Sequence, residues 1–266
     1  MFPSLNETIG WGRGIESILP NSTILLGDSN PIDALPFIYT FMNFWLKSSA
    51  LNPLNSSNQA ATAIILVSFK TAQSRVTNVF RKLYGIQLNL LAAQSKFAFV
   101  DAVTTDADSL ISEIEAALKK TEKSRTLIIL EGFAWTLASG MGSISSFTKL
   151  FTKIQSSMQN YNTNLLIQWS RDLESDYPGR NPLLIEDVRL GGAGWSRLLA
   201  SAHYVFCVRP LKSGMSRDAN GEIVAALGPA MQAVEAKPVF HPIITLFRIP
   251  TDNTIQCFTK GNNGNL

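Results

Sequence analysis

The sequence predicts an α/β fold, with a mostly parallel sheet, helices on both of its faces and an antiparallel C-terminal edge. Short apolar runs alternate with helical segments over roughly 200 residues, the order expected of parallel strands joined by crossover helices. Most of these runs are apolar throughout, as strands buried on both faces are. After residue 209, strands follow one another with only loops between them, which favours antiparallel pairing.

The expected strands are short runs rich in Ile, Leu, Val and Phe. They cover residues 23–26, 63–67, 97–101, 127–131, 165–169, 204–209, 222–227, 243–249 and 255–259. We find no internal repeat and no second linker, so residues 1–266 are expected to form a single domain. Residues 1–22 are expected to form an N-terminal extension anchored by Trp11 and Ile15, and residues 260–266 a frayed tail.

The expected helices lie between these strands and carry start and stop signals. They cover residues 32–47, 71–84, 106–120, 145–161 and 195–201. Gly85 follows the second helix directly, and helices commonly end on a left-handed glycine. Asp106 and Asp108 stand at the start of the third helix, and Lys119 and Lys120 stand at its end. This charge order suits the helix dipole.

Charge is scarce in this chain. Charged residues make up 16% of the 266 residues, against about 25% in an average domain, and the net charge is +3. Such a chain is expected to bury surface against partners or to carry Ser- and Asn-rich surfaces, and its mild basicity permits nucleic-acid contact. Residues 1–7 lack the features of a signal peptide. The most apolar segment, 34–46, is too short to span a bilayer, so we expect a soluble intracellular protein.

The segment 23–35 has the layout of a phosphate-binding loop: a strand, a glycine and a helix start. A loop that began at Gly27 would need Gly, Lys and Ser or Thr at the positions held by Ile32, Asp33 and Ala34. A carboxylate replaces the lysine ammonium and would repel a polyphosphate. Two interpretations stay open. The chain has either lost nucleotide binding from a nucleotide-binding architecture, or it is an ordinary strand–turn–helix that never bound phosphate.

Glu131 and Asp101 end two expected strands, where α/β enzymes place active groups. Without a phosphate loop beside them, a solvated or interface position is favoured over catalysis. His203 and His241 lie far apart in the sequence and are interpreted as structural. No Cys and His cluster has metal-ligand spacing, so neither a metal nor a cofactor is expected. Both cysteines fall inside apolar runs and are expected to be buried and reduced.

Five basic residues are candidates for contact with a phosphate backbone, because arginine in particular suits bidentate phosphate binding. They are Arg171, Arg180 and Arg189 in the long loop 170–194, and Lys212 and Arg217 in a later turn. Several carboxylates offset the charge of the long loop: Asp172, Glu174, Asp176, Glu186 and Asp187. An ordinary solvated loop is therefore the alternative interpretation.

Residues 205–225 predict a β-hairpin, with a polar turn between a strand that runs into Pro210 and a strand that returns from Glu222. The string Pro210-Leu211-Lys212-Ser213-Gly214, followed by Arg217-Asp218 and Gly221, resembles the hairpin of the sixth subunit of the eukaryotic Elongator complex. That family carries a Pro-Leu-Lys-Thr-Gly type of sequence followed by a basic-Asp pair and a glycine. Over the rest of the chain, the resemblance is one of element order and length.

The resemblance implies a RecA-like (P-loop NTPase-like) fold without working nucleotide motifs, and no enzymatic activity of this subunit. It implies a hetero-hexameric ring with the fourth and fifth subunits, two copies of each, joined to the remaining Elongator subunits in the cytoplasm and nucleus. That ring is an accessory part of the machine that modifies the wobble uridine of transfer RNA, and it binds transfer RNA (tRNA). In RecA-like rings the loops after the fourth and fifth strands face the centre. Residues 132–143 and 170–194 are therefore the candidate RNA-facing loops.

Two alternatives stay open. An active, atypical P-loop-like ATPase or kinase would bind nucleotide as an isolated chain. A plain scaffold without RNA contact would leave the RNA affinity of the ring unchanged after charge reversal at Arg171, Arg180 and Arg189.

Overall fold

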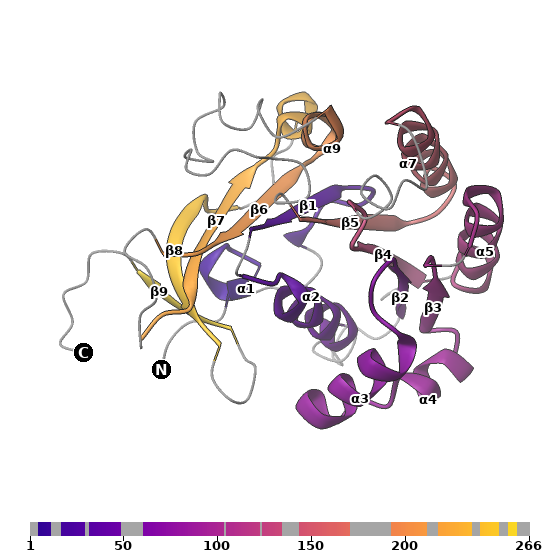
Figure 1. The fold of residues 1–266 in the computed structure, drawn as a ribbon, viewed down its shortest axis with the longest axis horizontal. Helices are drawn as coiled ribbons and strands as arrows, with labels where there is room; N and C mark the ends of the chain where they lie inside the picture. The colour runs from indigo at the N-terminus through magenta and orange to yellow at the C-terminus, as the bar shows by residue number, and fades with distance from the viewer. Residues whose placement is uncertain are drawn as a thin grey trace.

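The computed structural model describes residues 5–11, 17–29, 32–48, 61–103, 105–122, 124–134, 144–170, 193–211, 218–235, 240–249 and 255–259. Within them the strands are β1 (Thr23–Asp28), β2 (Ala61–Ser68), β3 (Phe97–Asp101), β4 (Ser124–Glu131), β5 (Thr163–Ser170), β6 (Tyr204–Arg209), β7 (Gly221–Leu227), β8 (Ile243–Arg248) and β9 (Gln256–Thr259). They form one nine-stranded sheet in the order β3-β2-β4-β5-β1-β6-β7-β8-β9 (Figure 1).

The six strands β1 to β6 pair in parallel. β7 pairs antiparallel with β6, and β8 and β9 continue this antiparallel pairing, as predicted. Helices cover both of its faces (Figure 1). One face carries α1 (Leu5–Thr8), α2 (Leu35–Ser48), α3 (Gln73–Tyr84) and α4 (Leu88–Ala93). The other face carries α5 (Ala107–Lys120), α7 (Ile144–Met158) and α9 (Ala193–Ser201). A 3-10 helix, η4 (Pro229–Ala233), lies against α9.

The parallel strands β1 to β6 are largely apolar because each of them contributes side chains to the cores on both faces of the sheet. Successive residues of a strand point to opposite faces of the sheet. In β1, Ile24 and Leu26 join the core on the α2 face, whereas Leu25 joins the core on the face of α5, α7 and α9. The residues of β4 divide in the same way. The continuous apolar runs of the sequence therefore mark strands covered on both sides.

Several boundaries differ from the prediction. β1 continues through Gly27 to Asp28, because both residues pair in parallel with β5 and β6. The glycine is thus a strand residue and does not open the turn. α2 begins at Leu35 rather than at residue 32. The sequence prediction missed α4 and η4, which are too short to show a helical period.

The predicted helix ends are confirmed where caps were visible in the sequence. Gly85 adopts φ 67°, ends α3, and donates its N–H to the Phe80 carbonyl. Asp106 precedes α5, and its side chain accepts the amide hydrogens of Asp108 and Ser109. Each cap satisfies a backbone group that the helix itself leaves unpaired.

The N-terminal extension is anchored by Trp11, which is fully buried. Its ring packs edge-on against Tyr204 and Phe206 of β6, with centroid distances of 5.2 and 5.5 Å. Phe41 of α2 completes the cluster at 5.8 Å. The extension therefore belongs to the core on the α2 face. The second expected anchor, Ile15, lies outside the described residues.

The predicted hairpin is confirmed at its base, where β6 and β7 pair antiparallel. Arg209 and Glu222 are partners in register, and their side chains form an ion pair of 2.9 Å with little exposure to solvent. Gly221 lies beside them, where a Cβ would stand 2.5 Å from the Arg209 carbonyl oxygen. Close backbone approach therefore requires glycine at this position. The tip, residues 212–217, lies outside the described residues.

We predict that Gly221→Ala lowers the free energy of unfolding by about 2 kcal/mol, because the new methyl group overlaps a backbone oxygen that cannot rotate away. Urea unfolding of both proteins measures the loss. Gly85→Ala is the control: a Cβ there meets nothing within 4 Å, and only the φ of 67° is unfavourable. That variant should lose about 1 kcal/mol. Equal losses in the two variants would contradict the steric cause.

Candidate functional site

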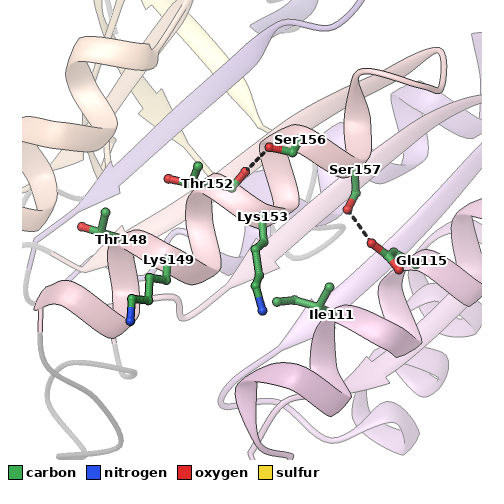
Figure 2. Close-up of a pocket in the computed structure, with 8 residues that line it drawn as sticks. All are labelled: Ile111, Glu115, Thr148, Lys149, Thr152, Lys153, Ser156 and Ser157. Carbon is green, nitrogen blue, oxygen red and sulfur yellow. Dashed lines mark hydrogen bonds between the residues drawn. The ribbon is translucent and has the colours of Figure 1, made fainter.

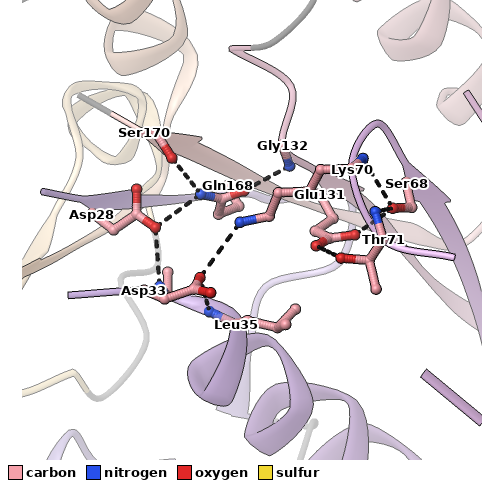
Figure 3. A network of polar contacts seen from close by, with 11 residues as sticks. Asp28, Asp33, Leu35, Ser68, Lys70, Thr71, Glu131, Gly132, Gln168 and Ser170 are labelled. Atoms are coloured by element: carbon pink, nitrogen blue, oxygen red, sulfur yellow. Dashed lines mark hydrogen bonds and ion pairs between the residues drawn. The ribbon is translucent and has the colours of Figure 1, made fainter. Parts of the chain in front are cut away.

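The carboxyl ends of β1, β2, β4 and β5 meet the N-terminus of α2 at one edge of the sheet (Figure 3). Ligands of open α/β sheets bind at this edge. Five side chains there hold the strand ends together, and we call them the strand-end network. They are Asp28, Ser68, Thr71, Glu131 and Gln168.

Two carboxylates of the chain itself occupy the start of α2. The Ala34 N–H donates to Oδ2 of Asp28 at 2.9 Å. The Leu35 N–H donates to Oδ1 of Asp33, also at 2.9 Å. In a phosphate-binding loop, amides at this point of the fold point at the phosphate oxygens. Here the protein supplies both acceptors itself.

The next amides of the first helical turn are also used. Pro36 has no N–H to offer. The Phe37 and Ile38 N–H groups both donate to the Ala34 carbonyl, at 2.9 and 3.1 Å. From residue 34 to residue 38, all of which the structure describes, no amide hydrogen is left for a phosphate.

Asp28 is buried, and burial raises the pKa of its carboxyl above the ordinary 3.8. Hydrogen bonds from the Ala34 amide and the Ser170 hydroxyl act against this rise in pKa, as does the charge of Lys70. Gln168 donates its Nε2–H to Oδ2 of Asp28 at 3.0 Å. Asp28 is thus a buried acceptor shared by a helix start and a neighbouring strand.

Gln168 connects three strand ends. Its Oε1 accepts the Gly132 N–H at 2.6 Å, just beyond the end of β4. Its Nε2 donates to Asp28 and also to the Ser170 hydroxyl, at 3.1 Å. Gly132 has φ 73°, so the chain turns sharply at this contact. Gln168 is the polar residue in an otherwise apolar run, and that was the signal that sequence reasoning passed over.

Glu131 was expected to be solvated or at an interface, and the solvated position is wrong. The side chain is 1% exposed. Thr71 donates its hydroxyl to Oε1 at 2.5 Å, and the Ser68 hydroxyl donates to Oε2. These hydroxyls from the end of β2 and just beyond it stabilise the buried carboxylate. Asp101 is exposed, as predicted, and accepts the Val103 N–H.

The four positions that the sequence compared with a phosphate loop have structural roles. Gly27 is a strand residue, Ile32 packs on the core of the α2 face, and Ala34 is buried. Asp33 is half-exposed, and its Oδ1 lies 3.4 Å from Nζ of Lys70. This ammonium group comes from the connection between β2 and α3 (Figure 3), not from α2. Asp33 therefore pairs with the cation that lies beside the helix start.

The candidate RNA-contacting residues stay predictions. Arg171, Arg180, Arg189, Lys212 and Arg217 all lie outside the described residues. The structure describes Gly132 to Ala134 at the start of the first candidate loop. Of the second it describes Ser170 and residues 193–194, which belong to α9 and not to a loop. Both starts join the strand-end network, the first through the Gly132 amide and the second through the Ser170 hydroxyl.

Of the two histidines that were interpreted as structural, His203 has such a role. Nδ1 of His203 accepts the Thr23 N–H at 3.1 Å, and burial lowers the pKa of its imidazole. His241 is exposed. Cys207 and Cys257 are buried and are not joined in a disulfide, as predicted, and burial raises the pKa of the Cys257 thiol to about 11. In the described part of the chain, no group of three or more His, Cys, Asp or Glu could hold a metal. None of the described helices is long and apolar enough to cross a bilayer.

A groove runs between α5 and α7 (Figure 2). It is lined by Ile111, Glu115, Thr148, Lys149, Thr152, Lys153, Ser156 and Ser157. Ser157 donates to Glu115 at 2.9 Å, and Lys153 pairs with the exposed Asp108 at 2.8 Å. These contacts tie the two helices together, so we interpret the groove as part of their packing.

Comparison with known proteins supports the fold. The crystal structure of a KaiC-like protein from the hyperthermophilic archaeon Pyrococcus horikoshii OT3 matches with a TM-score of 0.64, over 97% of this chain and 96% of that one. The two sequences are 12% identical, an identity that shows the fold alone. This protein therefore has a KaiC-like, RecA-type α/β fold. No family model matches the chain, and no curated protein matches its sequence.

We predict that Asp28→Asn gains stability relative to the wild type as pH rises. The folded pKa of Asp28 is raised, so the folded state binds this proton more tightly than the unfolded chain does. The contribution of Asp28 to the free energy of unfolding therefore falls as pH increases from below 3.8 through the folded pKa. Asparagine keeps an acceptor oxygen and does not ionise. Urea unfolding across this pH range measures the difference.

Asp101→Asn removes a strand-end carboxylate that is exposed, and it is the matched control. A pH-independent difference between Asp28→Asn and the wild type would mean that burial does not disfavour the ionised carboxylate.

Proposed function

We propose that this chain is a non-catalytic subunit of a hetero-hexameric RecA-like ring of the Elongator type, in the position of the sixth subunit. Its partners are then the fourth and fifth subunits, two copies of each. Its role is to complete the ring and to help hold tRNA while another subunit carries out the wobble-uridine chemistry, in the cytoplasm and nucleus. The RecA-type fold and the hairpin string Pro210-Leu211-Lys212-Ser213-Gly214 support this assignment.

The occupied start of α2 carries the proposal that the subunit is non-catalytic. A nucleotide phosphate would have to displace Asp28 from the Ala34 amide and Asp33 from the Leu35 amide. It would then lie beside two carboxylates. Like charges about 4 Å apart near a protein surface repel by about 4 kcal/mol. Since the first turn of α2 offers no lysine in return, polyphosphate binding is opposed by both geometry and charge.

The composition supports assembly. Large permanent interfaces are depleted of charged residues. A chain with 16% charged residues fits a subunit that buries much of its surface in a ring. The described surface also carries apolar side chains such as Leu90, which is 57% exposed.

The position of the candidate loops supports RNA contact. Both loops begin at the carboxyl edge of the sheet, at Gly132 and Ser170, and these starts are joined through Gln168. The second loop carries Arg171, Arg180 and Arg189, whose guanidinium groups suit phosphate oxygens. The two loops are therefore neighbours at their bases.

Calorimetry with ATP and magnesium tests the proposal that the isolated chain does not bind nucleotide. The isolated chain is expected to give no saturable heat. The rival function, an atypical ATPase, is favoured by two observations: Lys70 places an ammonium beside the start of α2, and Glu131 is a buried carboxylate at the end of β4. Tight ATP binding that Glu131→Gln abolishes would establish the rival.

Co-expression with the fourth and fifth subunits, followed by size-exclusion chromatography, tests assembly. We expect this chain to elute with both partners at the size of a hexamer. A chain that stays monomeric in their presence would contradict the proposed place in a ring.

Charge reversal tests the proposed contact between the long loop and tRNA. The triple variant Arg171→Glu, Arg180→Glu and Arg189→Glu should weaken tRNA binding by the assembled ring about tenfold or more at roughly 0.1 M salt, and should flatten the salt dependence. The matched control makes the same charge change at three exposed lysines of α5 and α7: Lys119→Glu, Lys120→Glu and Lys149→Glu. Equal tRNA affinity in the loop variant and the wild type would support a plain scaffold.

A further inference from the structure

We propose that Gln168 is a positioning residue which, held by Asp28, fixes the starts of the two candidate RNA loops and so sets the tRNA affinity of the ring. The contact between Asp28 and Gln168 would then influence RNA binding although no nucleotide is bound there. The RNA part of this inference rests on the proposed function, whereas its geometric part does not.

The contacts of Gln168 make it a junction. It is fully buried and belongs to β5. Its side chain accepts the Gly132 N–H at 2.6 Å, and its main-chain oxygen accepts the Phe133 N–H at 3.3 Å. Its Nε2 donates to the Ser170 hydroxyl at 3.1 Å. One residue thus touches the chain where it leaves β4 and where it leaves β5.

Asp28 reinforces the orientation of the Gln168 side-chain amide that the Gly132 N–H also requires. A glutamine amide offers a donor on one side and an acceptor on the other. Oδ2 of Asp28 already accepts the Ala34 N–H, so it meets Gln168 as an acceptor and requires Nε2 on its side. The acceptor Oε1 is then left for the Gly132 N–H. A flipped amide would lose both bonds. Asp28 therefore acts on Gly132 without touching it.

Nucleotide exchange cannot release the hydrogen bond between Gln168 and Asp28. A bound phosphate leaves when a nucleotide dissociates, but Asp28 is part of β1 and stays in place. The loop starts should therefore keep one arrangement at every nucleotide concentration. In the other half of the strand-end network, the Glu131 carboxylate accepts its hydrogen bonds from Ser68 and Thr71, which provides an internal comparison.

Amide hydrogen exchange of the full chain tests the geometric part. In Asp28→Ala, the Gly132 amide should exchange about tenfold faster, the effect of losing one buried hydrogen bond. Asp28→Asn keeps the acceptor oxygen and should restore nearly wild-type exchange. The Ala102 amide, which donates to the Ser68 carbonyl, should not change and reports any global loss of stability.

Two further variants sharpen this test. Gln168→Leu removes the junction itself and should also expose the Gly132 amide to exchange. Asp101→Ala deletes an exposed strand-end carboxylate that bonds Val103, and it should leave Gly132 unchanged. Unchanged exchange at Gly132 in Asp28→Ala would overturn the proposed coupling.

Binding of tRNA to the assembled ring tests the remaining part. Asp28→Ala and Gln168→Leu should weaken binding several-fold, Asp28→Asn should not, and replacing ATP by ADP should leave these ratios unchanged. Faster Gly132 exchange with unaltered tRNA affinity would overturn the link to RNA. If the wild-type ring failed to form or to bind tRNA, the proposed function would be wrong, and amide exchange would still decide the role of Gln168.

Discussion

The hydrogen bond from the Ala34 amide to the Asp28 carboxyl is the contact on which the rest of the structure depends. A helix N-terminus carries a partial positive charge and unpaired N–H groups, so it stabilises an anion. In this chain the anion is a side chain of the preceding strand. The carboxyl is buried, which raises its pKa, and the helix start and Gln168 provide the compensating hydrogen bonds. The start of α2 thus has its hydrogen-bond acceptor within the chain itself.

The surrounding architecture holds this contact in place. β1 lies between β5 and β6, and pairing on both sides fixes the backbone of Asp28. The aromatic cluster around Trp11 joins the N-terminal extension to α2 and β6, so α2 cannot shift along the sheet without disturbing that cluster. The burial that stabilises the domain also keeps the helix start against its own carboxylate.

The fold could be predicted because burial on both faces leaves a clear pattern in the sequence. Runs such as 127–131 have no polar residue before their end, and Gly85 and Asp106 mark helix ends by local chemistry.

The site was predicted in part. Ile32, Asp33 and Ala34 predicted that the start of this helix lacks the residues of a phosphate loop, and the loss of an earlier nucleotide site stays a prediction. The network itself could not be foreseen, because Asp28, Gly132 and Gln168 meet through pairing of strands that are distant in sequence. Glu131 was misplaced for the same reason, since its hydroxyl partners come from another strand end.

Nuclear magnetic resonance of the Ala34 and Leu35 amides tests the central claim most directly. Because both amides already have carboxylate acceptors, they should be protected from hydrogen exchange in the free chain, and their chemical shifts should not move when ATP and magnesium are added. Rapid exchange of these amides in the free chain, followed by large saturable shifts on addition of ATP, would contradict the account. That result would mean that the start of α2 is open and binds phosphate.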